Sequence, residues 1–154
     1  MQAGLSWITI LRKRKNFRSA FDNFDAMQIA AYGANKIESL LHDTGIVRNR
    51  LKVESVVINA QRLIEVQGEF GSFDDFIWQF VDGRQKQNSW QNHNDIPVST
   101  PESVKMSKEL KRRGFKFVGP TICYAYMQAT GMVNDHITGC YRHSELRGML
   151  SEAS

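Results

Sequence analysis

The sequence predicts an all-α fold, and two observations lead to this class. Several segments carry apolar residues at intervals of three and four, and each begins or ends at residues that commonly cap helices. No segment shows the alternation of apolar and polar residues that marks a half-buried strand. With 154 residues, of which 42% are hydrophobic, the chain is long enough to bury a substantial core. We therefore expect one helical domain.

The first expected helices are short. Ser6 is placed to cap a helix that begins at Trp7 and ends in the basic run Arg12–Lys15, where cations suit the negative end of the helix dipole. Asp25 is placed to cap a second helix, which Gly33 would end. The dipole explains the basic run without any binding partner.

A predicted helical hairpin over residues 37–60 is the central feature. Apolar residues recur at helical spacing on both sides of the short polar break Asp43-Thr44-Gly45. Gly45 stands where the chain leaves the first helix, so we expect a positive φ there. The second helix, expected from Val47, would begin with free backbone N–H groups able to hold a phosphate. Three cations follow that start: Arg48, Arg50 and Lys52.

Two interpretations of the hairpin are equally consistent with these residues. A helix-hairpin-helix would grip a nucleic-acid backbone through its turn and its cations without reading the base sequence. An ordinary corner between two packed helices would leave the same charges solvated.

The rest of the chain continues the helical pattern. The second hairpin helix is expected to stop at Gly68 and Gly71, and Ser72 is placed to cap the next helix. Residues 83–99 are polar and aperiodic, which predicts a loop. Thr100-Pro101 predicts the start of a helix over residues 103–113. A further helix over residues 121–130 is apolar on all sides, which predicts a buried central helix.

Composition narrows the possible partners. The net charge of +4 and the isoelectric point near 9.2 favour a polyanionic partner. Two cysteines, Cys123 and Cys140, do not make a disulfide framework and suit a reducing cytosol, so we expect a cytoplasmic protein. No apolar run is long enough for a transmembrane helix, and the start does not resemble a signal peptide.

A metal site is one candidate for chemistry. His136 and Cys140 lie four residues apart, so on a helical turn both could reach one Zn²⁺. A structural zinc site needs four ligands, and the other candidates, Cys123, His93 and His143, have no telling spacing. Taken alone, the pair favours chance or core packing.

Aromatic residues near cations are a second candidate. In the run Arg112–Phe117, Phe115 and Phe117 alternate with cations, an arrangement that suits stacked bases, although core packing is favoured. Three more aromatic residues could line a cavity for a flat ligand but are also favoured as core: Trp7, Tyr124 and Tyr126. No nucleophile constellation or glycine-rich phosphate loop is present.

Three stretches resemble a known family: QAGLSWITILRKR from residue 2, DTGIVRNRLK from residue 43, and KRRGFKFVGPTICYAYMQATGMVNDHITGC from residue 111. They resemble the DNA-3-methyladenine glycosylase I family, which belongs to the helix-hairpin-helix DNA glycosylase superfamily. The resemblance implies a glycosylase helical domain over residues 1–142 and a variable C-terminal tail over residues 143–154. It implies base-excision repair of alkylated double-stranded DNA by a monomer, which flips 3-methyladenine out and hydrolyses its N-glycosidic bond.

The resemblance also implies roles for particular residues. Trp7 matches the tryptophan that stacks on the methylated base, and Gly4 and Leu5 match the loop that fills the gap left by the flipped nucleotide. His136 and Cys140 match the last two of the four ligands of a structural zinc ion. The DNA contacts of the hairpin are matched by four residues: Thr44, Gly45, Ile46 and Arg48.

The chain departs from the family at its start. Family members carry about forty more residues ahead of this first motif, and these supply the first Cys and His ligands of the zinc ion. The same segment holds aromatic residues of the base pocket and a glutamate that hydrogen-bonds the methylated base, so no catalytic residue is assigned in this sequence. We therefore expect an N-terminally truncated glycosylase with little or no activity by itself. Two alternatives stay open: an inactive DNA-binding remnant of the same fold, or a helical domain that binds another protein.

Overall fold

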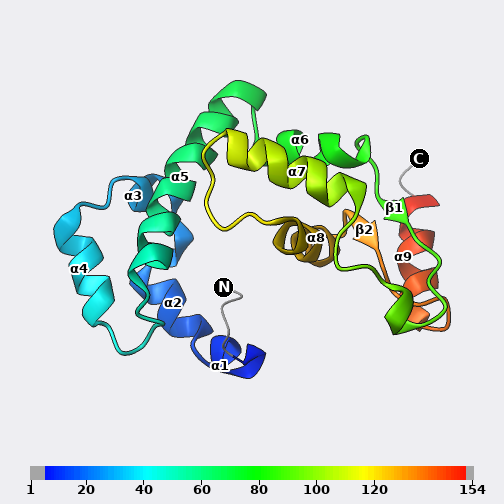
Figure 1. The fold of residues 1–154 in the computed structure, drawn as a ribbon, viewed down its shortest axis with the longest axis horizontal. Coiled ribbons are helices and arrows are strands. Elements are labelled where there is room, and N and C mark those ends of the chain that lie inside the picture. Colours follow the sequence, from blue (N-terminus) through cyan, green and yellow to red (C-terminus); the bar gives the residue numbers. More distant parts are fainter. Residues whose placement is uncertain (1–5, 152–154) are drawn as a thin grey trace. The chain divides into compact units, whose positions relative to one another are not determined.

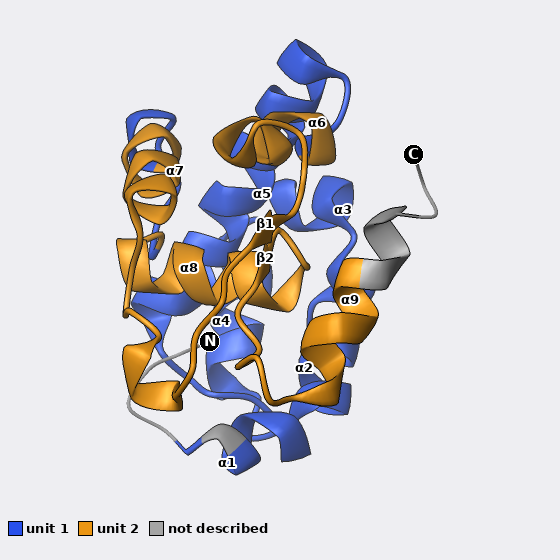
Figure 2. Ribbon diagram, turned by 90° about the vertical axis from the view of Figure 1, so that its right-hand side faces the viewer, with its two compact units in different colours: residues 1–73, 111–117 blue, residues 74–110, 118–154 orange. Residues whose placement is uncertain are grey.

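The computed structural model describes residues 6–151, with the backbone alone at Trp7 and at residues 148–151. The chain divides into two compact units, coloured separately in Figure 2. Unit 1 contains Met1–Phe73 and Lys111–Phe117, and unit 2 contains Asp74–Leu110 and Val118–Ser154. Within the described residues, no helix combines the length and the apolar composition that crossing a membrane would require.

Unit 1 is built around the long helix α5, Arg50–Phe70. The elements before it are short: α1 Trp7–Arg12, α2 Arg14–Ala20, η1 Asp22–Phe24, α3 Ala26–Ala30 and α4 Ala34–His42. Helices α3 and α4 pack directly against α5, and Figure 1 shows α2, α3 and α4 around its first half. One stripe of α5 is therefore buried along this half, as its apolar spacing requires.

The core of unit 1 lies between α5 and these shorter helices. Its buried members are Phe17, Phe21, Ile29, Leu40, Ile46, Val53, Val57 and Ala60. Full burial of one such aliphatic or aromatic side chain contributes about 1.5–3 kcal/mol. This cluster is therefore the main source of stability in unit 1.

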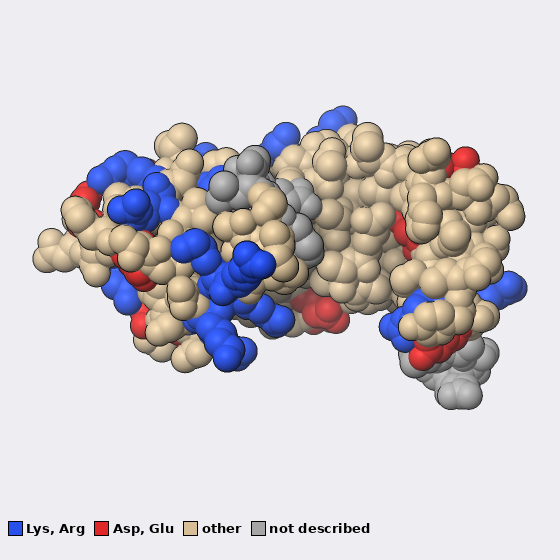
Figure 3. All heavy atoms as spheres, turned by 90° about the horizontal axis from the view of Figure 1, so that it is seen from below, with Lys and Arg blue, Asp and Glu red and all other residues tan. Residues whose placement is uncertain are grey.

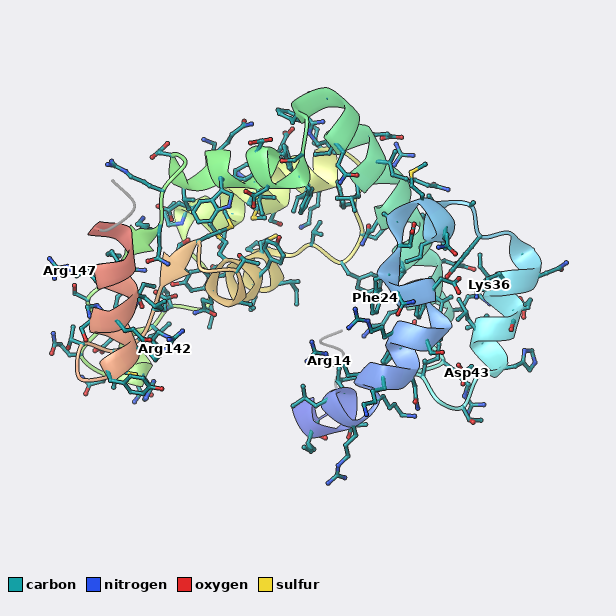
Figure 4. The ribbon with its side chains drawn as sticks, turned by 180° about the vertical axis from the view of Figure 1, so that it is seen from behind. Arg14, Phe24, Lys36, Asp43, Arg142 and Arg147 are labelled. Carbon is teal, nitrogen blue, oxygen red and sulfur yellow. The ribbon has the colours of Figure 1, made fainter. Side chains whose placement is uncertain are left out.

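A left-handed turn joins α2 to α3. Asp22, Asn23 and Phe24 follow one another with φ values of 48°, 58° and 61°, a conformation that is strained for residues other than glycine. Three contacts hold the turn. The Tyr32 hydroxyl donates to Asp22, Lys36 pairs with the same carboxylate at 3.1 Å, and the Phe24 ring stacks on Phe21 with 5.9 Å between centroids. Figure 4 labels two of these residues, Phe24 in η1 and Lys36 on α4.

Replacing Tyr32 with phenylalanine tests these contacts. The Tyr32 hydrogen bond, followed by Lys36, holds the pKa of Asp22 below its ordinary value of 3.8. A carboxyl group with a lowered pKa stabilises the fold above its ordinary pKa, and this stabilisation is lost as the pH falls through the folded-state pKa. We expect Tyr32→Phe to lower Tm by a few degrees at neutral pH, with a smaller difference below about pH 3.8. Thermal melts across this range check it, and a difference independent of pH would contradict it.

The segment 111–117 belongs to unit 1 although unit 2 surrounds it in the sequence. The side chain of Asn59, on α5, accepts from the backbone N–H of Lys116 at 2.7 Å and donates to its carbonyl at 3.1 Å. The Arg113 guanidinium donates to both carboxylate oxygens of Glu69, at 2.5 and 2.9 Å. The second half of α5 is thus tied to this returning segment.

Unit 2 contains the remaining helices and a small sheet. Its elements in chain order are α6 Phe73–Trp78, η2 Gln79–Val81, β1 Lys86–Gln87, η3 His93–Asp95, α7 Pro101–Arg112, α8 Pro120–Ala129, β2 Val133–Asn134 and α9 Tyr141–Ser151. The two strands run parallel, with Lys86 opposite Val133 and Gln87 opposite Asn134. The first residue of α6 and the last two of α7 belong to unit 1.

Most of the expected helices are confirmed, and so is the all-α class. The starts at Asp25 and Thr100 are capped as expected: Asp25 accepts from the backbone of Gln28 at 3.0 Å, and Thr100 accepts from the backbone of Ser103 at 3.3 Å. The expectation of no strand and of a plain loop over residues 83–99 is wrong, because β1 and η3 lie within that segment. Strands of two residues are too short to show any periodicity.

Several local expectations are wrong. The first helix breaks at Lys13, and the Ser6 side chain contacts the Thr9 hydroxyl at 2.8 Å instead of capping the backbone. Gly68 lies inside α5, which continues to Phe70 and has Gly71 as its C-cap. Helix α8 is not buried on all sides, because Tyr124 is 2% exposed while Tyr126 is 37% exposed. The core interpretation holds for Tyr124.

Candidate nucleic-acid interface

The turn between α4 and α5 is held by side chains from both directions. The Asp43 carboxylate accepts the backbone N–H of Gly45 at 2.7 Å. The ammonium group of Lys13, at the break between α1 and α2, donates hydrogen bonds to the carbonyl oxygens of Thr44 and Gly45 at 3.0 and 3.1 Å. The Asn16 amide donates to the same Gly45 carbonyl at 3.2 Å. The conformation of the turn is therefore fixed by its own aspartate and by two side chains from outside the hairpin, Lys13 and Asn16.

The reason for glycine at position 45 differs from the expected one. The positive φ predicted for Gly45 is wrong, because the glycines with positive φ in the described residues lie elsewhere in the chain. Close approach is the actual constraint. A Cβ atom at Gly45 would lie 2.8 Å from Asp43 Oδ1 and 3.1 Å from Asn16 Nδ2, both closer than ordinary contacts. A side chain at this position would push apart the groups that hold the turn.

The start of the second hairpin helix also differs from the prediction. Helix α5 begins at Arg50 and not at Val47, and the Asn49 side chain caps it by accepting the backbone N–H of Lys52 at 3.1 Å. That donor is therefore not free for a phosphate. Arg50 is engaged as well, with Glu38 at 2.6 Å and Glu54 at 3.6 Å, and the hydrogen bond from Glu38 raises the pKa of Arg50.

The other predicted hairpin residues differ in exposure. Thr44 and Arg48 are exposed, and no carboxylate of the described residues pairs with Arg48. Ile46 is 3% exposed and belongs to the core cluster, so its side chain attaches the turn to the core of unit 1. Gly4 and Leu5 lie outside the described residues, as does the side chain of Trp7.

A basic surface adjoins this turn. The members of the basic surface are Arg12, Arg14, Lys15 and Arg18, all exposed on α1 and α2. Figure 3 shows Lys and Arg side chains gathered over this part of unit 1, and Figure 4 labels Arg14, at the start of α2, together with Asp43. Among the described residues no ion pair joins these four cations to a carboxylate. A group of unpaired, exposed cations attracts a polyanion over several ångströms.

His136 and Cys140 do come together in unit 2. The His136 Nδ1 atom lies 3.8 Å from the Cys140 sulfur, and both side chains are at least partly accessible. The other candidate ligands lie elsewhere: Cys123 is buried against the Val118 carbonyl, and the His143 ring contacts the Asn88 carbonyl at 2.8 Å. Within residues 6–151 no group of three or more possible ligands converges. Because a tetrahedral zinc site needs four, these residues alone do not fit a complete zinc site.

Asp135 is a polar centre that the sequence analysis missed. Its carboxylate accepts from Asn88 at 2.7 Å, from the Trp90 ring N–H at 2.8 Å and from Gln128 at 2.8 Å. The hydroxyl of Tyr124 lies close by but makes no hydrogen bond of good geometry. Burial acts to raise the pKa of Asp135, but these polar neighbours outweigh burial and hold the pKa below its ordinary value.

The surroundings of Asp135 give it a structural role. A cavity of about 250 Å³ borders Asp135 and His136. The available sequence signal was the position of Asp135 two residues after the apolar pair Met132-Val133, where a charge needs several partners. Asp135 therefore ties the residues around β1 to α8, next to the His136–Cys140 pair.

Gly45→Ala tests the crowding at the turn. We expect a loss of about 1–3 kcal/mol in the free energy of unfolding, because the new Cβ would displace the Asp43 carboxylate or Asn16. Gly68→Ala is the matched control, since a Cβ at Gly68 meets nothing within 4 Å, and a gain of about 0.5–1 kcal/mol is expected inside a helix. Denaturant unfolding of both variants measures the difference. An unchanged stability of Gly45→Ala would show that the turn tolerates a side chain.

Comparison with known proteins places the chain in a family. A family model described as methyladenine glycosylase matches residues 1–143. DNA-3-methyladenine glycosylase 1 of Escherichia coli strain K12 is 46% identical over 139 residues, which cover 90% of this chain and 74% of that protein. DNA-3-methyladenine glycosylase of Haemophilus influenzae is 42% identical over 90% of this chain and 75% of its own length.

Solved structures agree with the sequence relatives. A crystal structure of 3-methyladenine DNA glycosylase I superposes with a TM-score of 0.86 at 51% identity, covering 91% of this chain and 77% of the other. The 3-methyladenine DNA glycosylase I of Staphylococcus aureus, solved to explain its recognition of 3-methyladenine, gives a TM-score of 0.86 at 34% identity over 91% of this chain and 74% of its own. Sequence and fold agree over the same residues, and the chain belongs to the methyladenine glycosylase family.

Proposed function

We propose that this chain acts in DNA base-excision repair as a glycosylase that releases 3-methyladenine from alkylated DNA. The observation that carries the proposal is the 46% identity over 139 residues to an enzyme of that name. The family model matches residues 1–143, so the hairpin turn and the basic surface described above fall within the matched residues. A protein that only packs against another protein would not need exposed, unpaired cations beside a fixed turn.

The chemistry needs little assistance at the base. Methylation at N3 leaves the adenine cationic, so the bond from its N9 to the sugar C1′ breaks with its electron pair moving to the base, which departs neutral. Water adds its oxygen to C1′ and gives its proton to solvent. The task of the protein is then to extrude the nucleotide and to hold a flat cation, which an aromatic face can do. Trp7 is the residue to which we assign this stacking.

The DNA contacts are assigned to the turn and to the start of the chain. The proposed helix-hairpin-helix is the pair α4 and α5, with Thr44, Gly45 and Arg48 facing the phosphates and Ile46 packed beneath them. The exposure of Thr44 and Arg48 and the absence of any described ion pair at Arg48 support this assignment. Gly4 and Leu5 are proposed to fill the gap that the flipped nucleotide leaves. We further propose that the substrate is double-stranded and that a monomer acts on it in the cytoplasm.

Release of free 3-methyladenine from methylated duplex DNA tests the function. We expect release by a fusion of this chain with the part of the Escherichia coli relative that it does not cover, and at least about a tenfold loss in the Trp7→Ala variant of that fusion with DNA affinity retained, because stacking acts on the base and not on the backbone. Chromatography of the released base and fluorescence anisotropy of a labelled duplex measure the two quantities. Salt-dependent binding by the fusion without any base release would contradict the proposed activity and fit a DNA-binding remnant instead. The same assay on the chain alone decides whether residues beyond this sequence are needed to complete the site.

We also propose that His136 and Cys140 are two ligands of a structural zinc ion. Their 3.8 Å separation supports a shared metal, and the further ligands must be ones that the described residues do not provide. Cobalt(II) titration tests this by absorption spectroscopy, because a cobalt–thiolate bond has its own charge-transfer band. We expect the band in a fusion of this chain with the part of the Escherichia coli relative that it does not cover, and a weaker band in the Cys140→Ser variant of that fusion, while Cys123→Ser, altered at a buried cysteine, leaves it unchanged. No thiolate band in the fusion would contradict the assignment.

A further inference from the structure

Helix α1 is not held in unit 1 by the burial of its described side chains. Among the side chains of α1 that the structure describes, none is buried, and Ile8 and Leu11 are 52% and 45% exposed. The next buried side chain along the chain is that of Phe17 on α2, which is 5% exposed. A helix of six residues is also too short to be stable through its own hydrogen bonds. Within the described residues, the position of α1 therefore depends on contacts outside the apolar core.

Lys13 makes such contacts in three directions. Its backbone N–H closes α1 by donating to the Thr9 carbonyl at 3.3 Å, and its own carbonyl opens α2 by accepting from the N–H of Phe17 at 2.9 Å. Its ammonium group reaches the hairpin turn, at the carbonyl oxygens of Thr44 and Gly45. Figure 1 shows the loop between α4 and α5 passing beside the junction of α1 and α2. One residue thus joins α1, α2 and the turn.

The side chain of Lys13 differs from those of the neighbouring cations. Arg12, Arg14 and Lys15 are exposed, whereas Lys13 is half-buried. No carboxylate of the described residues pairs with Lys13, so the two carbonyl oxygens of the turn are its described acceptors. An ammonium group can donate to both at once, which an apolar side chain cannot do. Lys13 therefore acts on the turn and not as a free surface charge.

The turn has further supports that do not involve α1. Asp43 accepts the Gly45 N–H at 2.7 Å, Asn16 on α2 donates to the Gly45 carbonyl at 3.2 Å, and Ile46 belongs to the core cluster. These contacts join the turn to itself, to α2 and to the core of unit 1. Loss of the Lys13 ammonium should therefore release α1 while the turn stays in place.

We propose that Lys13 is a positioning residue that holds α1 in a fixed place relative to the hairpin turn, so that a DNA backbone bound at the turn brings the extruded base to Trp7. The inference rests on the proposed function, which assigns base stacking to Trp7, the first residue of α1. A misplacement of about 1 Å in a reacting complex can cost about a hundredfold in rate. Lys13 therefore governs the rate of base release more than the affinity for the DNA backbone.

Lys13→Met tests this role in the fusion of this chain with the part of the Escherichia coli relative that it does not cover. Methionine is a long side chain without a donor, so both hydrogen bonds to the turn are lost. We expect the rate of 3-methyladenine release at saturating protein to fall at least about tenfold. Affinity for an undamaged duplex, measured by fluorescence anisotropy, should stay within about threefold. Arg48→Met should show the opposite pattern, with a larger loss of affinity than of release rate, because Arg48 is assigned to a phosphate.

A double-variant cycle separates positioning from a loss of folded protein. If Lys13 acts through Trp7, adding Lys13→Met to Trp7→Ala should slow release by less than about a further twofold. A fusion that is only less folded would lose the same factor with either residue at position 7. Equal losses in the two backgrounds would overturn the proposal, as would affinity and release rate falling together in Lys13→Met.

Amide hydrogen exchange of the chain itself tests the link to α1 without an activity assay. We expect Lys13→Met to speed exchange in peptides covering α1 by at least about fivefold, with exchange in α5 unchanged. Lys15→Met is the matched control, because Lys15 is an exposed cation without a described contact to the turn, and exchange in α1 should stay the same. Unchanged exchange in α1 of Lys13→Met, or faster exchange throughout unit 1, would overturn the proposal. Absence of release by the unaltered fusion would contradict the proposed activity, and the exchange measurement would still decide whether Lys13 holds α1.

Discussion

The close packing of Gly45 against Asp43 and Asn16 is the constraint on which the hairpin turn depends. Because no Cβ intervenes, the Asp43 carboxylate reaches the backbone N–H of Gly45 at 2.7 Å, and Lys13 reaches the carbonyls on the other side of the turn. The turn is thus fixed both by its own aspartate and by the break between α1 and α2. Exposed groups on a fixed turn lose little conformational freedom when they contact a phosphate, which favours binding.

Some cations of unit 1 are paired with carboxylates, whereas others have no described carboxylate partner and can contact a polyanion. Arg50 and Arg113 are paired with carboxylates of unit 1, and such pairs on a surface contribute little to affinity for a polyanion. Arg48 and the four members of the basic surface remain without a described carboxylate partner. These charges lie on the first two helices and on the turn that Lys13 joins to them. These cations can neutralise phosphates of a DNA strand, and the release of the counterions condensed on the DNA favours binding.

Sequence reasoning predicted what local patterns determine and failed where distant contacts decide. Helical spacing and the caps at Asp25 and Thr100 gave the helices and the all-α class, because these signals act within one or two turns. The left-handed turn at 22–24 contains no glycine, and although Asp22 and Asn23 tolerate this conformation, the sequence analysis did not predict it. The role of Lys13 depends on a contact 31 residues away, and its cation had a sufficient local explanation in the helix dipole. The reason for Gly45 could not be found from the sequence, since crowding by Asn16 exists only in the folded chain.

The candidate site residues show the same contrast between local patterns, which the sequence predicts, and contacts with distant residues, which it does not. His136 and Cys140 lie close together, although residues 136–140 form a turn and not the helix from which that proximity was predicted. The hairpin turn was located correctly, but the cap at Asn49 and the ion pairs of Arg50 occupy groups that the sequence left free. Phe115 and Phe117 are both phenylalanines that flank Lys116, and the sequence did not predict that one ring is buried and the other, at a residue with positive φ, is exposed.

The return of segment 111–117 to unit 1 has a consequence for biosynthesis. Unit 1 is discontinuous in the chain, because α6 and most of α7 are made between its two parts. During translation the second half of α5 must therefore remain without Arg113 and the Asn59–Lys116 pairing until the ribosome has passed position 117. A nascent chain arrested after Phe73 would hold an incomplete unit 1, which can be completed only after residues 74–110 of unit 2 have been synthesised.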